Sequence, residues 1–385
     1  MDFDLSQDQK MLVDNAATFA KKESPVARLR KLRDSEQGWE PLMWKQMGQL
    51  GWLALPFPES AGGLGLGWLE VCLLAEQLGA TLVPEPIVPS LVAGMGIVRA
   101  GDAAQAAEWI GLLGEGRTSL ALAWAEDNSR YDVATVATRA EKKGDGYVLR
   151  GKKTWVLNGH AADAYVVSAR TAGTERDRQG VSLFVIPAGE TGLTVRPVKT
   201  MDGHKAAIVE LDGVEVGASA RLGAEGGAVP VLCELMDLGA AAACAEGHGI
   251  MRAVLWMTVE YLNTREQFGV KIGTFQALQH RAVDMFIQTE LARSTSILSM
   301  IKATDRDVGE REQAVSAAKV QLATGGRFVT QQSIQLHGGI GVTDEHDVGL
   351  YFKRMHVLNA LWGDEEHHLA RFAKSPKFAA GVTAG

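Results

Sequence analysis

The sequence predicts an α+β protein in three parts: an N-terminal α-helical domain (1–117), a middle β-barrel or β-sandwich (118–222) and a C-terminal four-helix bundle (223–385). Two changes of hydrophobic period predict this division. Apolar residues recur at helical spacing up to about Gly116, alternate with polar residues from about Thr118, and return to long helical stripes from Val231. Short strands separated by glycine turns are typical of a barrel or sandwich. A glycine-rich linker around Leu222 to Pro230 precedes the last helices.

The N-terminal part has recognisable helix signals. Ser6 is a plausible N-cap for a helix over Gln7 to Lys22, with Gln9 at the spacing of a capping box. The glycine run GGLGLG at Gly62 to Gly67 is not preceded by a strand, so we expect a structural loop rather than a nucleotide-binding loop. Further amphipathic segments are Trp39 to Leu50 and Leu69 to Leu78.

The middle part alternates with a period of two. Gly144-Asp145-Gly146 is a hairpin signal between two such segments. The expected strands are Ala134 to Glu141, Tyr147 to Leu149, Lys153 to Leu157, Tyr165 to Ala169, Ser182 to Ile186 and Ala207 to Leu211.

The C-terminal part contains four long apolar stripes, which a four-helix arrangement buries well. Asp364, Glu365 and Glu366 fit the first turn of the last helix, where acidic residues are favoured. The expected helices are Val231 to Thr264, Phe275 to about Asp305, Arg311 to about His337, and Asp364 to Ala373.

Composition excludes several classes of function. A net charge of −7 argues against a general nucleic-acid binder, although it leaves room for a local basic pocket. Cys72, Cys233 and Cys244 lack paired metal spacing, so we expect buried thiols and no metal site. Without a signal peptide or a long apolar run, we expect a cytoplasmic protein with no membrane partner.

The segment Tyr261 to Gln279, YLNTREQFGVKIGTFQALQ, reads as the corner between two helices. Gly269 and Gly273 are expected to bracket the turn, because glycine takes the left-handed backbone that ends a helix. Arg265 supplies a guanidinium fork, and the neighbouring amides and aromatic rings suit a ligand that carries phosphates and a ring. The alternative is a polar helix hairpin with a buried Phe.

Three motifs, YLNTREQFG, IGTFQALQHRAVDM and QLHGGIG, occur in an order and spacing that resemble the acyl-CoA dehydrogenase family. The resemblance extends from FDLSQDQ near the start to HHLARFA near the end. It implies a helix–β–helix architecture, FAD as cofactor, an acyl-CoA substrate from which two hydrogens are removed at the α and β carbons, and an electron-transfer flavoprotein as acceptor.

In the resembled family each FAD lies between two subunits. One subunit's β-domain holds the isoalloxazine ring, and its neighbour's helical domain grips the pyrophosphate and the adenine. The resemblance assigns to the helical set Arg265, Gln267 and Phe268 on the pyrophosphate side, Phe275, Gln276 and Gln279 in an FQxxQ pattern, and Gln335, Gly338 and Gly339 on the adenine side.

The ring-side set is altered. Ala125 stands where the family has a threonine, and Leu157 replaces a second hydroxyl, whereas Trp155 and Asn158 are kept. Each lost hydrogen bond would weaken flavin binding by about 0.5–1.5 kcal/mol.

The usual catalytic base is replaced as well. The resemblance places Trp362 at its position, and an indole cannot abstract a proton. Some members carry the base on the first long C-terminal helix, at a position that here is Gly239. Glu246 lies seven residues later on nearly the same helix face, so it is a candidate base. Its alternative role is a packing or partner-facing carboxylate. His367 and His368 have no companions at metal spacing.

This combination resembles the small subunit of heteromeric acyl-CoA dehydrogenases of the pimeloyl-CoA and steroid side-chain types. We therefore expect the chain to complete the FAD site of a larger homologous dehydrogenase subunit, in an α2β2 assembly. The alternatives are a self-sufficient homo-oligomer that uses Glu246 and a flavin-free regulatory or structural paralogue. The slim stretch Gly239 to Ala243 indicates either a wide acyl pocket or close helix packing between subunits.

Overall fold

The structure is a computed structural model that describes residues 4–375, so Phe3 of the start segment and residues 376–385 lie outside it. It contains two compact units. The helical unit comprises Met1–Arg30, Cys72–Val83 and Ala240–Gly385, and the sheet unit comprises Lys31–Val71 and Pro84–Gly239. The division passes through α2 (Val26–Leu32), α4 (Trp68–Gly79) and α7 (Val229–Thr264). The three domain boundaries expected from the sequence stay a prediction.

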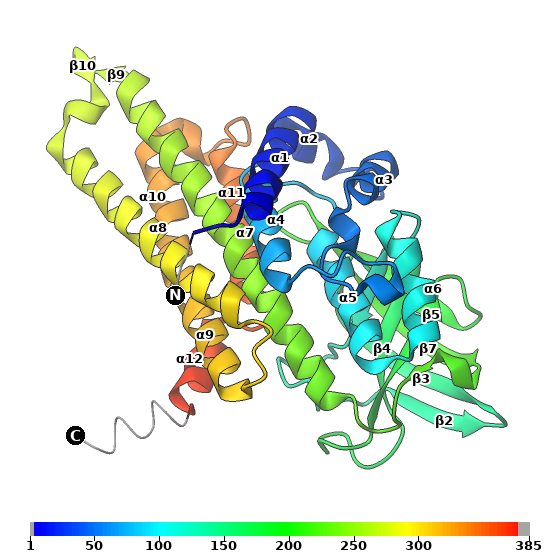
Figure 1. Cartoon of the computed structure of the whole chain (residues 1–385). Coiled ribbons are helices and arrows are strands. Elements are labelled where there is room, and N and C mark those ends of the chain that lie inside the picture. Colours follow the sequence, from blue (N-terminus) through cyan, green and yellow to red (C-terminus); the bar gives the residue numbers. More distant parts are fainter. Residues whose placement is uncertain (1–3, 376–385) are drawn as a thin grey trace, which may run out of the picture. The chain divides into compact units, whose positions relative to one another are not determined.

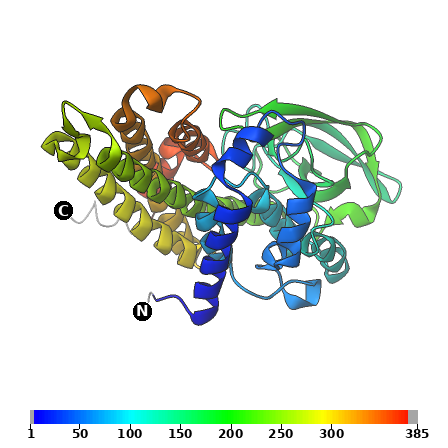
Figure 2. The same ribbon diagram turned by 90° about the horizontal axis from the view of Figure 1, so that it is seen from above.

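The sheet unit is built on one eight-stranded mixed sheet with the order β6-β7-β3-β2-β4-β5-β8, in which β1 pairs parallel with β4. In Figure 2 its strands curve around a common interior. The strands are β1 (Leu120–Ala123), β2 (Arg139–Lys143), β3 (Gly146–Leu157), β4 (Ala164–Arg170), β5 (Val181–Pro187), β6 (Leu193–Lys199), β7 (Lys205–Val216) and β8 (Arg221–Leu222).

Alternation along these strands creates the core of the sheet unit. Side chains from β1 to β5 and β7, among them Tyr147, Phe184 and Val209, form one buried apolar cluster. The hairpin signal is confirmed: β2 and β3 pair through Lys143 and Gly146, and Gly144 takes a left-handed φ of 56°. The expected strand over Ala134 to Glu141 begins only at Arg139, and the sequence reading missed β1 and β6.

Helices complete the sheet unit. Asp102 caps α6 through a reciprocal capping box with Gln105. The glycine run at Gly62 to Gly67 lies in the loop between η2 and α4, which confirms it as a structural loop. The helices are α3 (Pro41–Gln49), η1 (Trp52–Ala54), η2 (Glu59–Ala61), α5 (Ile87–Ala100), α6 (Ala103–Gly114) and η3 (Ala218–Ala220).

In the helical unit, α7 and α8 run side by side and are joined by the β9–β10 hairpin (Figure 1). The capping box of Ser6 and Gln9 at the start of α1 is confirmed, and Asp364 caps α12 by accepting from the His367 amide. The elements are α1 (Gln7–Glu23), β9 (Glu266–Gln267), β10 (Val270–Lys271), η4 (Ile272–Thr274), α8 (Gln276–Lys302), α9 (Val308–Gln321), η5 (Leu322–Gly326), α10 (Arg327–His337), η6 (Gly338–Val342), α11 (Val348–Ala360) and α12 (Glu365–Ala373).

The C-terminal bundle differs from expectation in two places. The third expected helix is interrupted by a π-helical turn, η5, which separates α9 from α10. The sequence reading missed α11, so this helix joins the four that were expected. Within residues 4–375 no helix combines the length and the apolar character needed to cross a membrane.

Small residues bring α7 into close contact with its neighbours. Ala240 to Ala245 are at most 2% exposed, so this stretch is packed within the chain. At Gly249 the packing is so close that a Cβ atom would lie 2.0 Å from the backbone oxygen of Glu76 on α4.

We therefore predict that Gly249→Ala lowers the free energy of unfolding by about 1–3 kcal/mol, because α4 must move to accept the methyl group. Gly111→Ala on α6 is the matched control, since its Cβ would meet nothing within 4 Å, and it should be neutral or stabilising. Denaturant unfolding of both variants is the measurement. Equal effects of the two substitutions would contradict the close packing.

Candidate functional site

The corner between α7 and α8 is a small β-hairpin. Gln267 pairs with Val270, and Phe268 and Gly269 form the turn with φ values of 55° and 77°. The left-handed backbone expected at Gly269 is thus confirmed. The expectation for Gly273 is wrong: its φ is not left-handed, and the residue instead permits close approach, because a Cβ there would lie 2.8 Å from the Leu262 oxygen.

Two aromatic rings stand at this corner. Phe268 is 91% exposed, and its ring lies 6.2 Å from that of Phe275 in an edge-to-face arrangement. A phenylalanine in left-handed backbone costs free energy, and such strain persists chiefly at functional positions. The alternative of a buried Phe is therefore wrong for Phe268, whose ring is available to a ligand or a second protein.

Arg265 directly follows α7, next to this hairpin. Within residues 4–375 its exposed guanidinium has no recorded hydrogen-bond or ion-pair partner. The side-chain amides of Gln267 and Gln279 donate to backbone oxygens of the corner, at 2.6 and 2.9 Å, whereas Gln276 is exposed at the start of α8. An unengaged guanidinium fork fits two phosphate oxygens.

The adenine-side loop begins where α10 ends. Gly338 has φ 62° and ψ −140°, and a Cβ at Gly338 or Gly339 would meet nothing within 4 Å. The ring of Tyr261 on α7 lies 4.6 Å from that of His337, which immediately precedes Gly338. The structure thus brings the end of α7 and the loop after α10 together. Exposed Gln335 and two glycines with open space beside them fit a ligand that approaches the backbone.

The ring-side surface lies in the sheet unit, at a β-bulge. Between Lys153 and Val156 strand β3 gains one residue relative to β7, and Trp155 there is 62% exposed with φ 52°. The Thr154 amide donates to the Ala125 oxygen at 2.8 Å. This hydrogen bond joins the two segments that the resemblance assigns to the flavin ring.

A buried ion pair also joins these two segments, and it was not predicted from the sequence. The Lys153 ammonium lies 2.6 Å from Glu126 and donates to the Ser168 hydroxyl at 2.9 Å, with its side chain fully buried. Glu126 also accepts from the amides of Ala137 and Thr138. No sequence signal distinguishes this lysine from the exposed lysines of the strand.

Burial and charge act against each other in this pair. Burial lowers the pKa of Lys153 to about 8, although Glu126 opposes the shift. Burial alone would raise the pKa of Glu126, but Lys153 outweighs it and the pKa is lowered. Both groups are therefore charged at neutral pH, and each depends on the other.

The surface beside this ion pair lacks the two hydroxyl groups that the resemblance implies. Ala125 and Leu157 are partly exposed and offer no side-chain donor. Asn158 is buried, accepts from the Trp39 indole at 3.0 Å, and leaves its own amide nitrogen without a partner in the described structure. The surface therefore fits a planar ring through Trp155 but contributes fewer hydrogen bonds than the resemblance requires.

Trp362 occupies a rigid loop between α11 and α12. The residue is 7% exposed and its φ is 61°. The buried Lys319 ammonium donates to the backbone oxygens of Leu358 and Leu361, and burial lowers its pKa to about 8. His368 bonds the Trp362 oxygen at 3.0 Å, which gives this histidine a packing role.

Glu246 is engaged by an arginine. Its two oxygens accept from the guanidinium of Arg354 on α11 at 2.6 and 3.0 Å, and both side chains are at least 85% buried. Two parallel hydrogen bonds of this kind fix the orientation of the carboxylate toward α11. This geometry supports the packing role over the role of a base.

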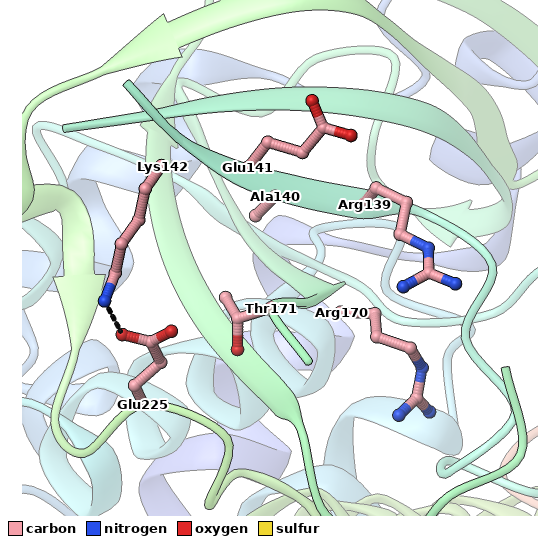
Figure 3. Close-up of a pocket in the computed structure, with 7 residues that line it drawn as sticks. All are labelled: Arg139, Ala140, Glu141, Lys142, Arg170, Thr171 and Glu225. Atoms are coloured by element: carbon pink, nitrogen blue, oxygen red, sulfur yellow. Dashed lines mark ion pairs between the residues drawn. The ribbon is translucent and has the colours of Figure 1, made fainter. Parts of the chain in front are cut away.

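The sheet unit also has a polar cavity of about 520 Å³ (Figure 3). Its charges are engaged locally: Lys142 lies 3.0 Å from Glu225, and the Arg170 guanidinium donates to backbone oxygens that include those of Val136 and Gln179. These contacts therefore hold the surrounding loops in place. Its lining residues are Arg139, Ala140, Glu141, Lys142, Arg170, Thr171 and Glu225.

Histidine, cysteine and carboxylate side chains do not gather at a metal-binding cluster anywhere in residues 4–375. Of the thiols, Cys72 and Cys244 are buried as expected, whereas Cys233 is only partly buried.

Comparison with protein-family models identifies three matching regions. Residues 6–117 match the N-terminal domain of acyl-CoA dehydrogenases, residues 121–214 the middle domain, and residues 229–376 the C-terminal domain.

Similar proteins span nearly the whole chain. Mitochondrial isovaleryl-CoA dehydrogenase of Pongo abelii is 31% identical over 91% of this chain and 84% of its own length. Acyl-CoA dehydrogenase IpdE2 of Mycolicibacterium smegmatis is 28% identical, over 95% and 98%. Among solved structures, the ChsE4-ChsE5 complex from Mycobacterium tuberculosis superposes with a TM-score of 0.87 at 28% identity, covering 97% of this chain and 98% of that one. A steroid ACAD, Tcur3481-Tcur3483, gives 0.85 at 30%, covering 98% and 99%.

We predict that Lys153→Met destabilises the protein by about 3–5 kcal/mol, because it leaves Glu126 buried without its cation. The double variant Lys153→Met with Glu126→Gln should recover much of that loss, since neither side chain is then charged. Denaturant unfolding compares the two. If the single variant lost less than about 1 kcal/mol of stability, the ion pair would not be what holds the two segments together.

Proposed function

The chain belongs to the acyl-CoA dehydrogenase family of FAD-dependent oxidoreductases, and from that premise we propose that it completes the FAD site of a larger homologous subunit. In this proposal Arg265 and the rest of the helical set hold the pyrophosphate and adenine of a flavin whose ring lies in the partner. The assembly, an α2β2 heterotetramer in the cytoplasm, removes two hydrogens from an acyl-CoA thioester. An electron-transfer flavoprotein accepts the electrons.

The observation that carries the proposal is the contrast between the two halves of the cofactor site. The helical half has an unengaged Arg265, an exposed Phe268 and an open glycine loop. The ring-side half has lost both hydroxyls at Ala125 and Leu157, and Trp362 occupies the position of the base. A chain that only grips a neighbour's nucleotide needs the first half and not the second.

An apolar stripe on α8 supports contact with a second subunit. Its members recur at helical spacing on one face and are each about half exposed, which is unusual for large side chains of a monomeric protein. Because α8 starts at the nucleotide corner, a subunit that covers the stripe also approaches Arg265. The stripe consists of Val283, Phe286, Ile287, Leu291 and Leu298.

The similar structures favour the same assembly. ChsE4-ChsE5 is a complex of two named chains, and Tcur3481-Tcur3483 is a steroid ACAD that also carries two chain names. A steroid side chain is therefore the acyl group that we propose first. The rival proposal, a self-sufficient dehydrogenase with Glu246 as base, would have to use a carboxylate that is held by Arg354.

We predict that Arg265→Ala lowers the flavin content of the complex with its larger subunit by at least tenfold, because charge-assisted bonds to the pyrophosphate contribute about 1.5–3 kcal/mol. Arg265→Lys should retain only part of the affinity, since an ammonium lacks the fork. Visible flavin absorbance after gel filtration is the readout, and Arg306→Ala, at an exposed position between α8 and α9, is the control. Normal flavin content in Arg265→Ala would show that Arg265 does not bind the FAD pyrophosphate.

We also predict that Ile287→Glu, with Leu291→Glu, dissociates the assembly, because a carboxylate buried against apolar surface is strongly destabilising. Ala107→Glu, at an exposed position of α6 away from the stripe, should leave it intact. Light scattering of the purified complexes gives the mass. An unchanged mass for the double variant would mean that the stripe is not an interface.

A further inference from the structure

We propose that His337 is a positioning residue of the nucleotide grip, and that its protonation opens the adenine-side loop and releases flavin as the pH falls. The inference rests on the proposed function, because it concerns the same grip. It assigns to His337 a role that does not require contact with the ligand.

His337 joins three segments of the helical unit. Its ring lies 4.6 Å from that of Tyr261 and 4.5 Å from that of His346, measured between ring centroids. Tyr261 lies on α7 four residues before Arg265, and His337 directly precedes Gly338. The contact between the Tyr261 and His337 rings therefore connects the pyrophosphate side of the grip to its adenine side.

Burial and an unpartnered Nε2 favour the neutral form of His337. Its Nδ1 lies 2.7 Å from the backbone oxygen of Ser333, and because a carbonyl only accepts, Nδ1 carries the proton. The residue is 1% exposed, and its Nε2 has no partner in the described structure. A second proton would create a buried N–H without an acceptor, which is strongly unfavourable.

His346 adds a like-charge constraint. Its Nδ1 accepts from the Val348 amide at 3.2 Å at the start of α11, so the ring is held facing His337. Burial lowers the pKa of His337, and His346 lowers it further, against the opposing effect of the Ser333 oxygen. Two imidazoles whose ring centroids lie 4.5 Å apart cannot both be charged without repulsion.

Charged groups on the neighbouring elements engage partners other than His337. On the loop before α11, Asp344 and Asp347 pair with Arg30. On α8, Arg281 donates to Gln332 of α10 at 3.2 Å. On α7 the facing titratable group is the ring of Tyr261 itself. None of these supplies a carboxylate that would stabilise a charged His337.

The sign of the pH effect follows. The pKa of His337 is lowered in the closed loop and returns toward about 6.5 when the loop opens. The closed loop is therefore fully favoured above that value and loses stability as the pH falls through it. Opening displaces Gly338 and Gly339, so flavin affinity should fall by up to about tenfold between about pH 7.5 and pH 5.5.

The test compares the flavin-containing complex of the wild type with that of His337→Phe, which keeps an aromatic ring but cannot titrate. The measured quantity is the ratio of flavin dissociation constants at about pH 5.5 and pH 7.5, taken within each protein. We expect a ratio of several-fold to about tenfold in the wild type and a nearly flat profile in the variant. His356→Phe, at an exposed position of α11, should retain the wild-type ratio.

A second readout uses this chain alone. Amide hydrogen exchange over residues 335–342, corrected for its intrinsic pH dependence, should accelerate at the lower pH in the wild type but not in His337→Phe. A flat wild-type ratio, or equal ratios in the two proteins, overturns the inference. If no flavin-containing complex forms at any pH, the proposed function fails instead, and the exchange measurement still decides whether His337 controls the loop.

Discussion

Left-handed backbone at large aromatic residues is the constraint on which the site depends. Trp155, Phe268 and Trp362, together with Asn158, make up four of the six non-glycine residues with positive φ in the described chain. Each such residue costs about 1–3 kcal/mol and persists only where its surroundings fix it. Here the surroundings are identifiable, because a buried ion pair, a tight hairpin and a lysine-capped loop respectively hold the three aromatic residues.

The hairpin, the ion pair and the lysine-capped loop differ in the chemical groups that they place at the site. The hairpin presents an exposed Phe268 beside an unengaged Arg265, which is ready for a ligand held by another subunit. The ion-pair clamp still presents Trp155, but beside Ala125 and Leu157, which cannot donate hydrogen bonds. The loop capped by Lys319 presents an indole where the family has a base. In the proposed division of the site, the chain keeps the fold of a dehydrogenase but retains cofactor-binding groups only on the nucleotide side.

Structural features could be predicted from the sequence where the residues that determine them are close together in the chain. Capping by Ser6 and Asp364, the hairpin at Gly144 and the loop at Gly62 to Gly67 all depend on residues within a few positions of one another. The sequence was insufficient where partners are distant. The sequence around Lys153 does not indicate its ion pair with Glu126. Likewise, the sequence around Gly273 does not indicate that its backbone lies against the Leu262 oxygen. Helix α11 was missed because its charged and polar residues obscure the apolar stripe.

The most direct measurement is the flavin content per polypeptide of this protein, purified alone and purified with a larger homologous dehydrogenase subunit. We expect the chain alone to carry no stoichiometric flavin and no acyl-CoA dehydrogenase activity, and the complex to carry both. Stoichiometric flavin with full turnover in the chain alone would contradict the division of the site between two subunits.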